Sequence, residues 1–441
     1  MNPPSVRPPP EAWTPAHRAA QALAAPIYRF FALEAASGLL LLLAVVVALV
    51  WANSPWHASY EALWHTNVGV ELGSWSLDKP LHFWVNEGLM TIFFLVVGLE
   101  IRRELYEGEL ATVRQAALPV AAAFGGVMLP ALLYAALNHG RAGSGGWAIP
   151  MATDIAFALG VLTLLGSRVP AASRVLLLGL AVIDDILAIV VIAVFFAGGI
   201  SIIGFVVAAA GIAGAWLLRS AGVRSAAVYL FPGIAVWFGL YAAGVHPTLA
   251  GVILGLLAPV RPWFGPAGFQ AATQSQLDGL LDAERPDLLG RLDEIERARR
   301  EAISPAERLI HALHPWVSFL VMPGFAFANA GVSLDGASLS GDGLWLFLGV
   351  VVGLVIGKPL GITAAAVASF RLGTTRSAEL TAKSIVLVGT VGGIGFTMSL
   401  FIAQLAFPSG PLLATAKLAI LTGSAVAMGI GLAYGRALFR R

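Results

Sequence analysis

Long apolar segments separated by short polar ones make up most of this chain and limit what it can fold into. Hydrophobic residues are 58% of its 441 residues and charged residues only 12%, about half the share in soluble domains. A helix needs about 20 mainly apolar residues to cross a bilayer. We therefore expect an all-α polytopic membrane protein. The twelve predicted transmembrane helices lie at residues 30–52, 81–101, 115–137, 147–166, 174–197, 201–219, 225–245, 247–260, 315–333, 343–370, 384–407 and 412–435.

Basic residues are distributed unevenly between the loops of this arrangement. Of the 27 lysine and arginine residues, 23 fall on the side that holds both termini. Short cytoplasmic loops are the ones that accumulate lysine and arginine, so we expect both termini in the cytoplasm. Residues 1–29 are rich in proline and lack the pattern of a cleaved signal, which predicts a disordered cytoplasmic tail. The membrane domain would then comprise residues 30–441.

Two of the predicted loops are long. The external loop 53–80 has alternating apolar residues, from Val68 to Leu77, on both sides of Gly73. This alternation is typical of a β-hairpin, and an isolated hairpin is marginally stable, so we expect it to pair with a partner. The cytoplasmic loop 262–304 carries charges of both signs at helical spacing, which predicts a solvated amphipathic helix.

Two adjacent aspartates, Asp184 and Asp185, lie inside one predicted span, in the run AVIDDILAIV. Sixteen Leu, Ile, Val and Phe residues of that span contribute roughly −5 to −10 kcal/mol to insertion, whereas two central aspartates cost about +5 to +7 kcal/mol. The helix can insert, but it loses most of its favourable free energy. Intramembrane ionisable residues usually mark an ion pathway, and the alternative is that the acids only bond neighbouring helices.

Two more charged residues lie at comparable depth. Asp154 follows Pro150 and Thr153 in the fourth span, and Lys358 lies near the middle of the tenth. Pairing a buried amine with a buried carboxylate is the cheapest arrangement, so we expect an ion pair. The eleventh span contains four glycines in VLVGTVGGIGFTMS. Spans interrupted by glycine or proline in both halves of a chain are typical of transporter binding sites, although each glycine alone fits close helix packing equally well.

Several carboxylates in one apolar region suit a hard cation, and the same oxygens bind protons. Burial and like-charge repulsion both favour the protonated form, so a cation and protons would compete for the site. If only an occupied site can reorient across the membrane, this competition becomes exchange. Neighbouring helical residues point about 100° apart, so Asp184 and Asp185 should have different partners while titrating as a coupled pair.

Seven long motifs surround these residues, in order from about residue 30 to the last span. They are GLMTIFFLVVGLEIRREL, IPMATDIAFALGVLTLLGSRVP, LAVIDDILAIVVIA, GVHPTLAGVILG, HALHPWVSFLVMPGFAFANAGVSL, IGKPLGI and GIGFTMSLFIA. Together they resemble the NhaA family of bacterial sodium/proton antiporters. The resemblance implies twelve helices in inverted-topology repeats with two interrupted helices. NhaA is itself one of the transporters from which the link between interrupted helices and binding sites was drawn. It also implies an inner-membrane protein that exports Na+ or Li+ in exchange for a larger number of entering protons. This exchange would be electrogenic and pH-dependent and would serve sodium and pH homeostasis.

The resemblance implies roles for individual residues. Asp184 and Asp185 would bind the metal ion, Na+ or Li+, and the protons. Thr153 and Asp154 would support binding at the interrupted fourth span and offset the helix-end dipoles. Lys358 would pair with Asp184 when the cation is absent.

Four further positions match residues associated with pH control: Glu100, Arg103, Glu104 and His246. Interfacial charges and a structural histidine explain these positions equally well. Ile310 departs from the family pattern, because it stands where the motif ERLIHALHPW can have a glutamate before its first histidine. Because of this departure, the family's pH-sensing residues cannot all be assigned to matching positions in this chain.

Two other functions fit parts of the pattern. Paired carboxylates activate water in aspartyl proteases, but the GxGD motif expected of the intramembrane class is absent. A channel would not need to neutralise its acids, and a carrier of organic solutes should have more polar or aromatic residues near them. We therefore expect a secondary active transporter, not an enzyme, with no cofactor. Its expected partners are Na+, H+, the lipid bilayer and, through the hairpin, a second copy of the chain, with no nucleic acid.

Overall fold

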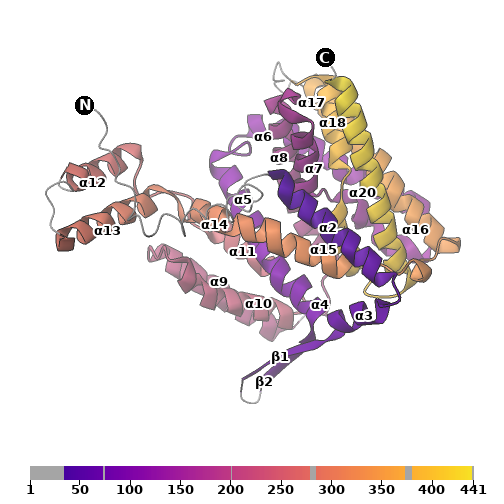
Figure 1. Ribbon diagram of the computed structural model, residues 1–441, viewed down its shortest axis with the longest axis horizontal. Helices are drawn as coiled ribbons and strands as arrows, with labels where there is room; N and C mark the ends of the chain where they lie inside the picture. Colours follow the sequence, from indigo (N-terminus) through magenta and orange to yellow (C-terminus); the bar gives the residue numbers. More distant parts are fainter. Residues whose placement is uncertain (1–33, 73–74, 200, 279–284, 373–379, 440–441) are drawn as a thin grey trace, which may run out of the picture.

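The structure, a computed structural model, describes residues 34–72, 75–199, 201–278, 285–372 and 380–439. The predicted tail 1–29 and the hairpin position Gly73 lie outside the described residues. Figure 1 shows a bundle of helices with a small hairpin at one end and the C-terminus at the opposite end.

The elements of the first half are α2 (Glu34–Ala52), α3 (His57–His65), β1 (Asn67–Leu72), β2 (Trp75–Pro80), α4 (Leu81–Phe83), η2 (Trp84–Leu89), α5 (Met90–Glu107), α6 (Val113–Asn138), η3 (Ala142–Met151), α7 (Ile155–Leu164), η4 (Gly166–Arg168), α8 (Ala171–Phe195) and α9 (Ile202–Ser220). Those of the second half are η5 (Ala226–Tyr229), α10 (Leu230–Ala242), α11 (Leu249–Leu257), α12 (Pro266–Asp278), α13 (Arg285–Ala302), α14 (Pro305–Trp316), η6 (Val317–Val321), α15 (Met322–Ala330), η7 (Leu334–Gly336), α16 (Gly341–Val352), η8 (Gly353–Gly357), α17 (Lys358–Arg371), α18 (Ala382–Gly392), α19 (Phe396–Ala406) and α20 (Pro411–Leu438). The segments η2, η6 and η8 are π-helical turns inside longer helices.

Seven of the described helices are long and apolar enough to cross a membrane, or ten spans result if each of three bent helix pairs counts as one. The chain is therefore an all-α multi-pass membrane protein with one small sheet. The two remaining predicted spans, 225–245 and 247–260, contain α10 and α11, which are only 13 and 9 residues long. Both fall short of the roughly 20 residues that a straight crossing needs, so the count of twelve stays a prediction.

The predicted β-hairpin is present, and β1 and β2 pair antiparallel. Trp84 of η2 donates its indole N–H to the backbone carbonyl of Val68 (2.8 Å), which ties the hairpin to the following helix. The sequence did not predict α3, which bends away from α2 by 114°. The Tyr60 hydroxyl of α3 donates to the backbone carbonyl of Phe327 (2.6 Å), so aromatic packing and this bond hold α3 against α15.

Glycines let helices approach closely inside the bundle. At the contact of α6 with α17, a Cβ built on Gly125 would lie 2.2 Å from the Gly361 carbonyl oxygen. At the contact of α5 with α11, a Cβ on Gly255 would lie 2.6 Å from the backbone nitrogen of Leu99. Lipid tails are as apolar as leucine, so close van der Waals contact through small residues is what holds membrane helices together.

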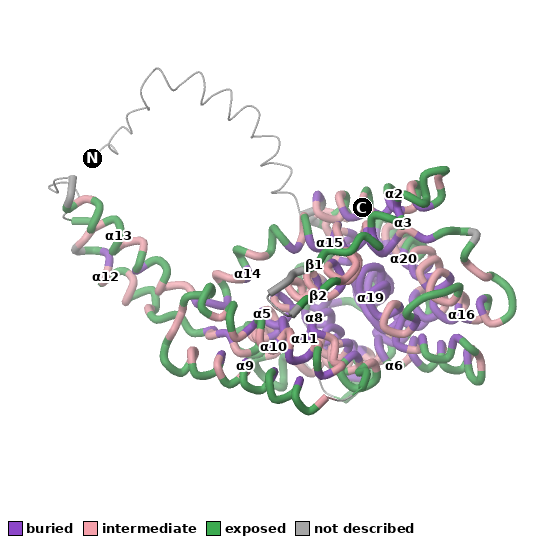
Figure 2. The backbone as a smooth tube through the Cα atoms, turned by 90° about the horizontal axis from the view of Figure 1, so that it is seen from below, coloured by how far each residue is buried: buried purple, intermediate pink, exposed green. Residues whose placement is uncertain are grey.

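Both predicted helix interruptions are present and lie against each other. The pair η3 and α7 is bent by 48°, and the pair α18 and α19 is bent by 46°. The backbone N–H of Asp154, at the first break, donates to the carbonyl of Ile394 at the second (2.7 Å). Figure 2 shows that the chain around α19 is largely buried, so the two breaks leave helix ends in the interior of the bundle.

The charged segment 262–304 forms a helical hairpin of α12 and α13 that projects from the bundle (Figure 1, Figure 2). On α13, Glu296 contacts Arg299 (2.7 Å) and Arg300 (3.2 Å) at the spacing expected of neighbours on a helix surface. All three side chains are exposed, in agreement with the predicted solvated helix.

Candidate functional site

Asp184 and Lys358 form a buried ion pair between α8 and α17. The Asp184 residue is 1% exposed and Lys358 is 0% exposed, and Lys358 Nζ contacts Asp184 Oδ2 directly. The Thr153 hydroxyl joins the pair, because it accepts from Lys358 Nζ (2.5 Å) and lies 2.6 Å from Asp184 Oδ2. It also lies 2.9 Å from the carbonyl oxygen of Gly392, at the end of α18. The hydroxyl therefore connects the ion pair to both helix breaks.

Two features around the pair are unusual. Lys358 follows directly on the π-helical turn η8, and π-bulges within α-helices occur frequently at functional sites. The second carboxylate oxygen of Asp184, Oδ1, is buried and has no hydrogen-bond partner among the described residues. A buried anionic oxygen without a donor is costly, so binding a cation or a proton there would be favourable.

Asp154 caps two helices at once. Its Oδ1 accepts the backbone N–H of Phe157 (3.2 Å) at the start of α7, and its Oδ2 accepts the backbone N–H of Thr397 (3.2 Å) at the start of α19. The Thr397 hydroxyl also donates to Oδ2. Helix N-termini carry a partial positive charge and free N–H groups, so one carboxylate between two of them stabilises both breaks. The sequence analysis had assigned no role to Thr397, although GIGFTMS placed it next to the glycines of the break.

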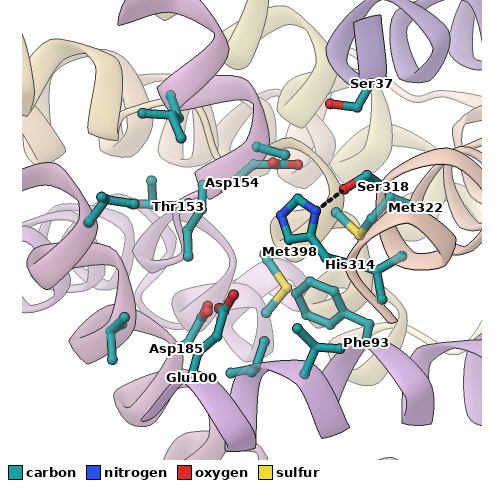
Figure 3. Close-up of a pocket in the computed structure, with 18 of the residues that line it drawn as sticks. Ser37, Phe93, Glu100, Thr153, Asp154, Asp185, His314, Ser318, Met322 and Met398 are labelled. Carbon is teal, nitrogen blue, oxygen red and sulfur yellow. Dashed lines mark hydrogen bonds between the residues drawn. The ribbon is translucent and has the colours of Figure 1, made fainter. Parts of the chain in front are cut away.

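Asp185 points away from its neighbour and into a cavity of about 250 Å³. The cavity is also lined by Thr153, Asp154 and Glu100. The Asp185 carboxylate makes no hydrogen bond or ion pair with any other described residue. Figure 3 shows its carboxylate beside that of Glu100, with Asp154 farther along the same cavity. The two adjacent aspartates thus occupy different environments, as their 100° separation on a helix predicts.

Three of the four carboxylates that line the cavity, those of Glu100, Asp154 and Asp185, have no ion-pair partner among the described residues, and the buried amine of Lys358 is already paired with Asp184. Burial and mutual repulsion both oppose three simultaneous negative charges. Each proton or cation that enters relieves this repulsion, so the arrangement can bind either. No group of three or more His, Cys, Asp or Glu residues is arranged to hold a metal ion in the part of the chain that the structure describes. A cation here would need neutral oxygens, such as the Thr153 hydroxyl, besides the carboxylates.

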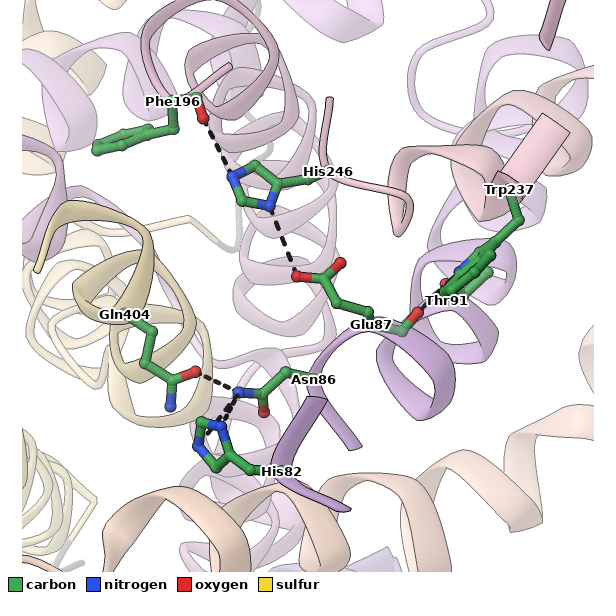
Figure 4. A network of polar contacts seen from close by, with 8 residues as sticks. All are labelled: His82, Asn86, Glu87, Thr91, Phe196, Trp237, His246 and Gln404. Carbon is green, nitrogen blue, oxygen red and sulfur yellow. Dashed lines mark hydrogen bonds and ion pairs between the residues drawn. The ribbon is translucent and has the colours of Figure 1, made fainter. Parts of the chain in front are cut away.

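The four candidates for pH control fall in two places. Glu100, Arg103 and Glu104 line the cavity, and Arg103 contacts Glu104 (3.3 Å). His246 does not line this cavity. It lies 3.6 Å from Glu87 and 3.1 Å from a backbone carbonyl oxygen just after α8 (Figure 4). The structure therefore separates His246 from the other three.

The departure at Ile310 has a packing explanation. Ile310 of α14 is buried in a small apolar cluster against α5. The other buried members of the cluster are Leu99, Ala258, Val260 and Ala306. At this position the chain has an apolar contact and no titratable group.

Comparison with known proteins shows similarity along nearly the whole chain. The family model described as Na+/H+ antiporter 1 matches residues 28–434. A protein named Na(+)/H(+) antiporter NhaA 2 from Sorangium cellulosum is 53% identical over 439 residues, which cover 98% of this chain and 94% of that protein. Its namesake from Myxococcus xanthus is 50% identical, covering 97% and 92%. Na(+)/H(+) antiporter NhaA from Bartonella henselae is 46% identical, covering 96% and 94%.

Proposed function

The chain belongs to the NhaA family of Na+/H+ antiporters, and from this membership we propose that it exchanges Na+ or Li+ for protons across the bacterial inner membrane. In the proposed cycle Na+ leaves the cell while a larger number of protons enters, so exchange is electrogenic. The exchange depends on pH, needs no cofactor and serves sodium and pH homeostasis. As secondary active transport, it is driven by the proton gradient.

The observation that carries the proposal is the contrast between the two adjacent aspartates. Asp184 is paired with Lys358 and has one oxygen without a donor in the part of the chain that the structure describes, whereas Asp185 faces the cavity. In the proton-loaded state, Asp185 is neutral and Lys358 balances Asp184. When Na+ enters, it binds between Asp185 and Asp184, releases the proton of Asp185 and takes over from Lys358 as the counter-charge of Asp184. Electrogenic exchange needs a second proton to leave in the same step, and Lys358, once separated from Asp184, is an amine that can release it. Thr153 and Asp154 hold the helix breaks in place around this exchange.

The proposal includes an arrangement in the membrane. Twelve spans form inverted repeats, with α10 and α11 as short crossings and both termini in the cytoplasm. Glu100, Arg103 and Glu104, at the cavity, and His246 set the pH response. The external hairpin pairs with that of a second copy, and cross-linking of Ser76→Cys tests this pairing cleanly because the chain has no cysteine of its own.

Everted membrane vesicles that contain the protein test the exchange directly. A proton gradient is established by respiration and followed with a pH-sensitive dye. Adding Na+ or Li+ should dissipate the gradient, and a change in membrane potential imposed with valinomycin and K+ should alter the rate, since exchange is electrogenic. Vesicles that stay silent at every pH from mildly acidic to alkaline would contradict the proposal.

The site assignment is tested by Asp185→Asn. The substitution preserves size and insertion but removes the charge, so exchange should be abolished. Asp342→Asn is the matched control, because Asp342 is an exposed aspartate that pairs with Arg141 (3.6 Å) away from the cavity. Exchange that survives Asp185→Asn would show that the ions bind elsewhere.

A further inference from the structure

A second buried polar cluster lies at the hairpin end of the bundle. The side-chain amides of Asn86, Asn329 and Gln404 form a closed ring, which we call the amide ring. Asn86 donates to Gln404 Oε1 (2.5 Å), Gln404 donates to Asn329 Oδ1, and Asn329 donates to Asn86 Oδ1 (2.8 Å). His82 Nε2 lies 2.8 Å from Asn329 Oδ1. Figure 4 shows Gln404 reaching across to His82 and Asn86.

The amide ring joins three separate helices. Asn86 comes from η2, Asn329 from α15 and Gln404 from α19. Asn329 is 0% exposed and Asn86 is 7% exposed. Because α19 begins at the second helix break, Gln404 connects the interrupted helix to two helices that lie outside the break.

An aromatic layer lies between the ring and the cavity. It consists of Phe94 of α5, Phe325 of α15 and Phe401 of α19, each at most 1% exposed. The Phe94 and Phe401 ring centroids are 5.4 Å apart, and those of Phe325 and Phe401 are 6.2 Å apart. The three helices that supply the amide ring therefore also supply the aromatic layer.

All three helices repeat one order from the cavity outward. On α19, Met398 lines the cavity, Phe401 belongs to the aromatic layer and Gln404 to the amide ring. On α15, the order is Met322, then Phe325, then Asn329. The third helix runs in the opposite direction, and its order is Val97, Phe94 and Asn86. The cavity is thus closed toward the hairpin by two successive layers.

The chemistry of the outer layer indicates what it does. A permanent wall needs only apolar packing, and buried polar groups in a membrane protein are costly unless every one is bonded. In the ring each amide both donates and accepts, so it is satisfied while closed. Its groups are neutral, so water can replace their partners at small net cost when the helices separate. Two of the three contributing helices also contain a π-helical turn beside these residues, η2 and η6, where helices commonly bend.

We propose that the aromatic layer and the amide ring are the closed gate on the hairpin side of the ion pathway. In each cycle α19 separates from α5 and α15, Gln404 exchanges its amide bonds for water, and the aspartate site opens toward the hairpin. The gate rests on the proposed function, because a site that exchanges ions between two sides needs access from each side in turn. None of its groups carries a negative charge that would retain a passing cation.

Thiol labelling tests the gate, since the chain has no cysteine of its own. Gln404→Cys is placed in right-side-out vesicles, and a membrane-impermeant maleimide is added outside. A gate held closed by a few hydrogen bonds has a minor open state, so Na+-driven turnover should raise the labelling rate about tenfold. Asn329→Cys is the second reporter, from a different helix, and it should show the same rise if Gln404→Cys fails to insert.

Two control cysteines fix the interpretation. Ser76→Cys, on the exposed face of the hairpin, should label fast with or without Na+. Asn138→Cys replaces another fully buried amide, one that donates to the carbonyl oxygens of Tyr134 and Trp345, and should stay unlabelled in both conditions. Proton movement is followed in the same vesicles and, in parallel, in vesicles that contain the unsubstituted protein. If Na+ moves protons in the reporter vesicles but leaves the labelling of both reporters unchanged, the gate is wrong and the exchange function stands; if Na+ moves no protons with the unsubstituted protein, the proposed function itself fails.

Discussion

The two buried polar clusters of this bundle differ in how completely their groups are satisfied. Around Asp184 the atoms carry charge, and one carboxylate oxygen has no donor among the described residues. Around Asn329 the atoms are neutral, and every amide of the ring both donates and accepts. Both clusters are held by helices that depart from regular α geometry, either at a break or at a π-helical turn.

This difference distinguishes an ion-binding site, around Asp184, from a closed gate, around Asn329. Unsatisfied charge in a low-dielectric interior creates a need for a counter-ion, which a proton or Na+ can meet. A saturated neutral ring creates no such need, but it specifies one closed arrangement of its helices. Substitutions that leave charge unpaired should therefore cost more than substitutions that leave amides unpaired.

The largest effect on stability is expected at the ion pair. Lys358→Met leaves Asp184 buried without its counter-charge, which typically costs about 3–5 kcal/mol. The double variant Lys358→Met/Asp184→Asn removes both charges and should recover most of that loss. Thermal unfolding of the detergent-solubilised protein measures both. Equal losses in the single and double variants would show that the two charges are not energetically coupled.

The amide ring should respond less. Asn329→Ala leaves a donor of Gln404 and an acceptor of Asn86 without partners, at a cost of about 2 kcal/mol. The matched control Asn138→Ala removes an equally buried amide outside the ring and should cost a similar amount. An unchanged unfolding temperature for Asn329→Ala would mean that water already solvates the ring in the resting state.

The sequence predicted the charged cluster well, because each charged residue inside an apolar span is conspicuous and needs a partner. Asp154, Asp184, Asp185 and Lys358 all converge, and both helix breaks lie where proline and glycine placed them. Single-residue reasoning did not anticipate that Thr153 joins the ion pair to the breaks. That contact depends on how the two breaks cross, which no local pattern encodes.

The neutral cluster was missed for a related reason. Asn86, Asn329 and Gln404 are single amides in apolar spans far apart in the sequence, and the N–H groups of a lone amide can donate to backbone carbonyls, as those of Asn138 do. Only their assembly distinguishes them. Helix length leaves the count of twelve spans a prediction, because α10 and α11 are shorter than a full crossing, and the sequence predicted a loop where α3 lies.

A smaller effect is expected at the double cap. Asp154→Asn keeps only one acceptor oxygen, so one of the two helices α7 and α19 loses its N-terminal cap, at a cost of about 1 kcal/mol. Asp154→Ala removes both caps and should cost about twice as much. Ser304→Ala, which removes the single cap on Glu307 at the start of α14, is the reference. Equal stability of the two Asp154 variants would contradict the shared cap.

The smallest effect is expected where the same kinds of charge meet in water. Hydrogen bonds from Arg299 and Arg300 lower the pKa of Glu296 from its ordinary value of 4.5 to about 2. Because the folded-state pKa is the lower one, any stabilisation is complete above about pH 4.5 and is lost as the pH falls toward 2. Water screens these exposed charges, so Glu296→Gln should leave the unfolding temperature at neutral pH unchanged within error. Thermal unfolding of Glu296→Gln at neutral and acidic pH, with and without added salt, measures this effect. A loss of stability comparable to that of Lys358→Met would mean that charge pairing, not burial, determines the cost of both substitutions.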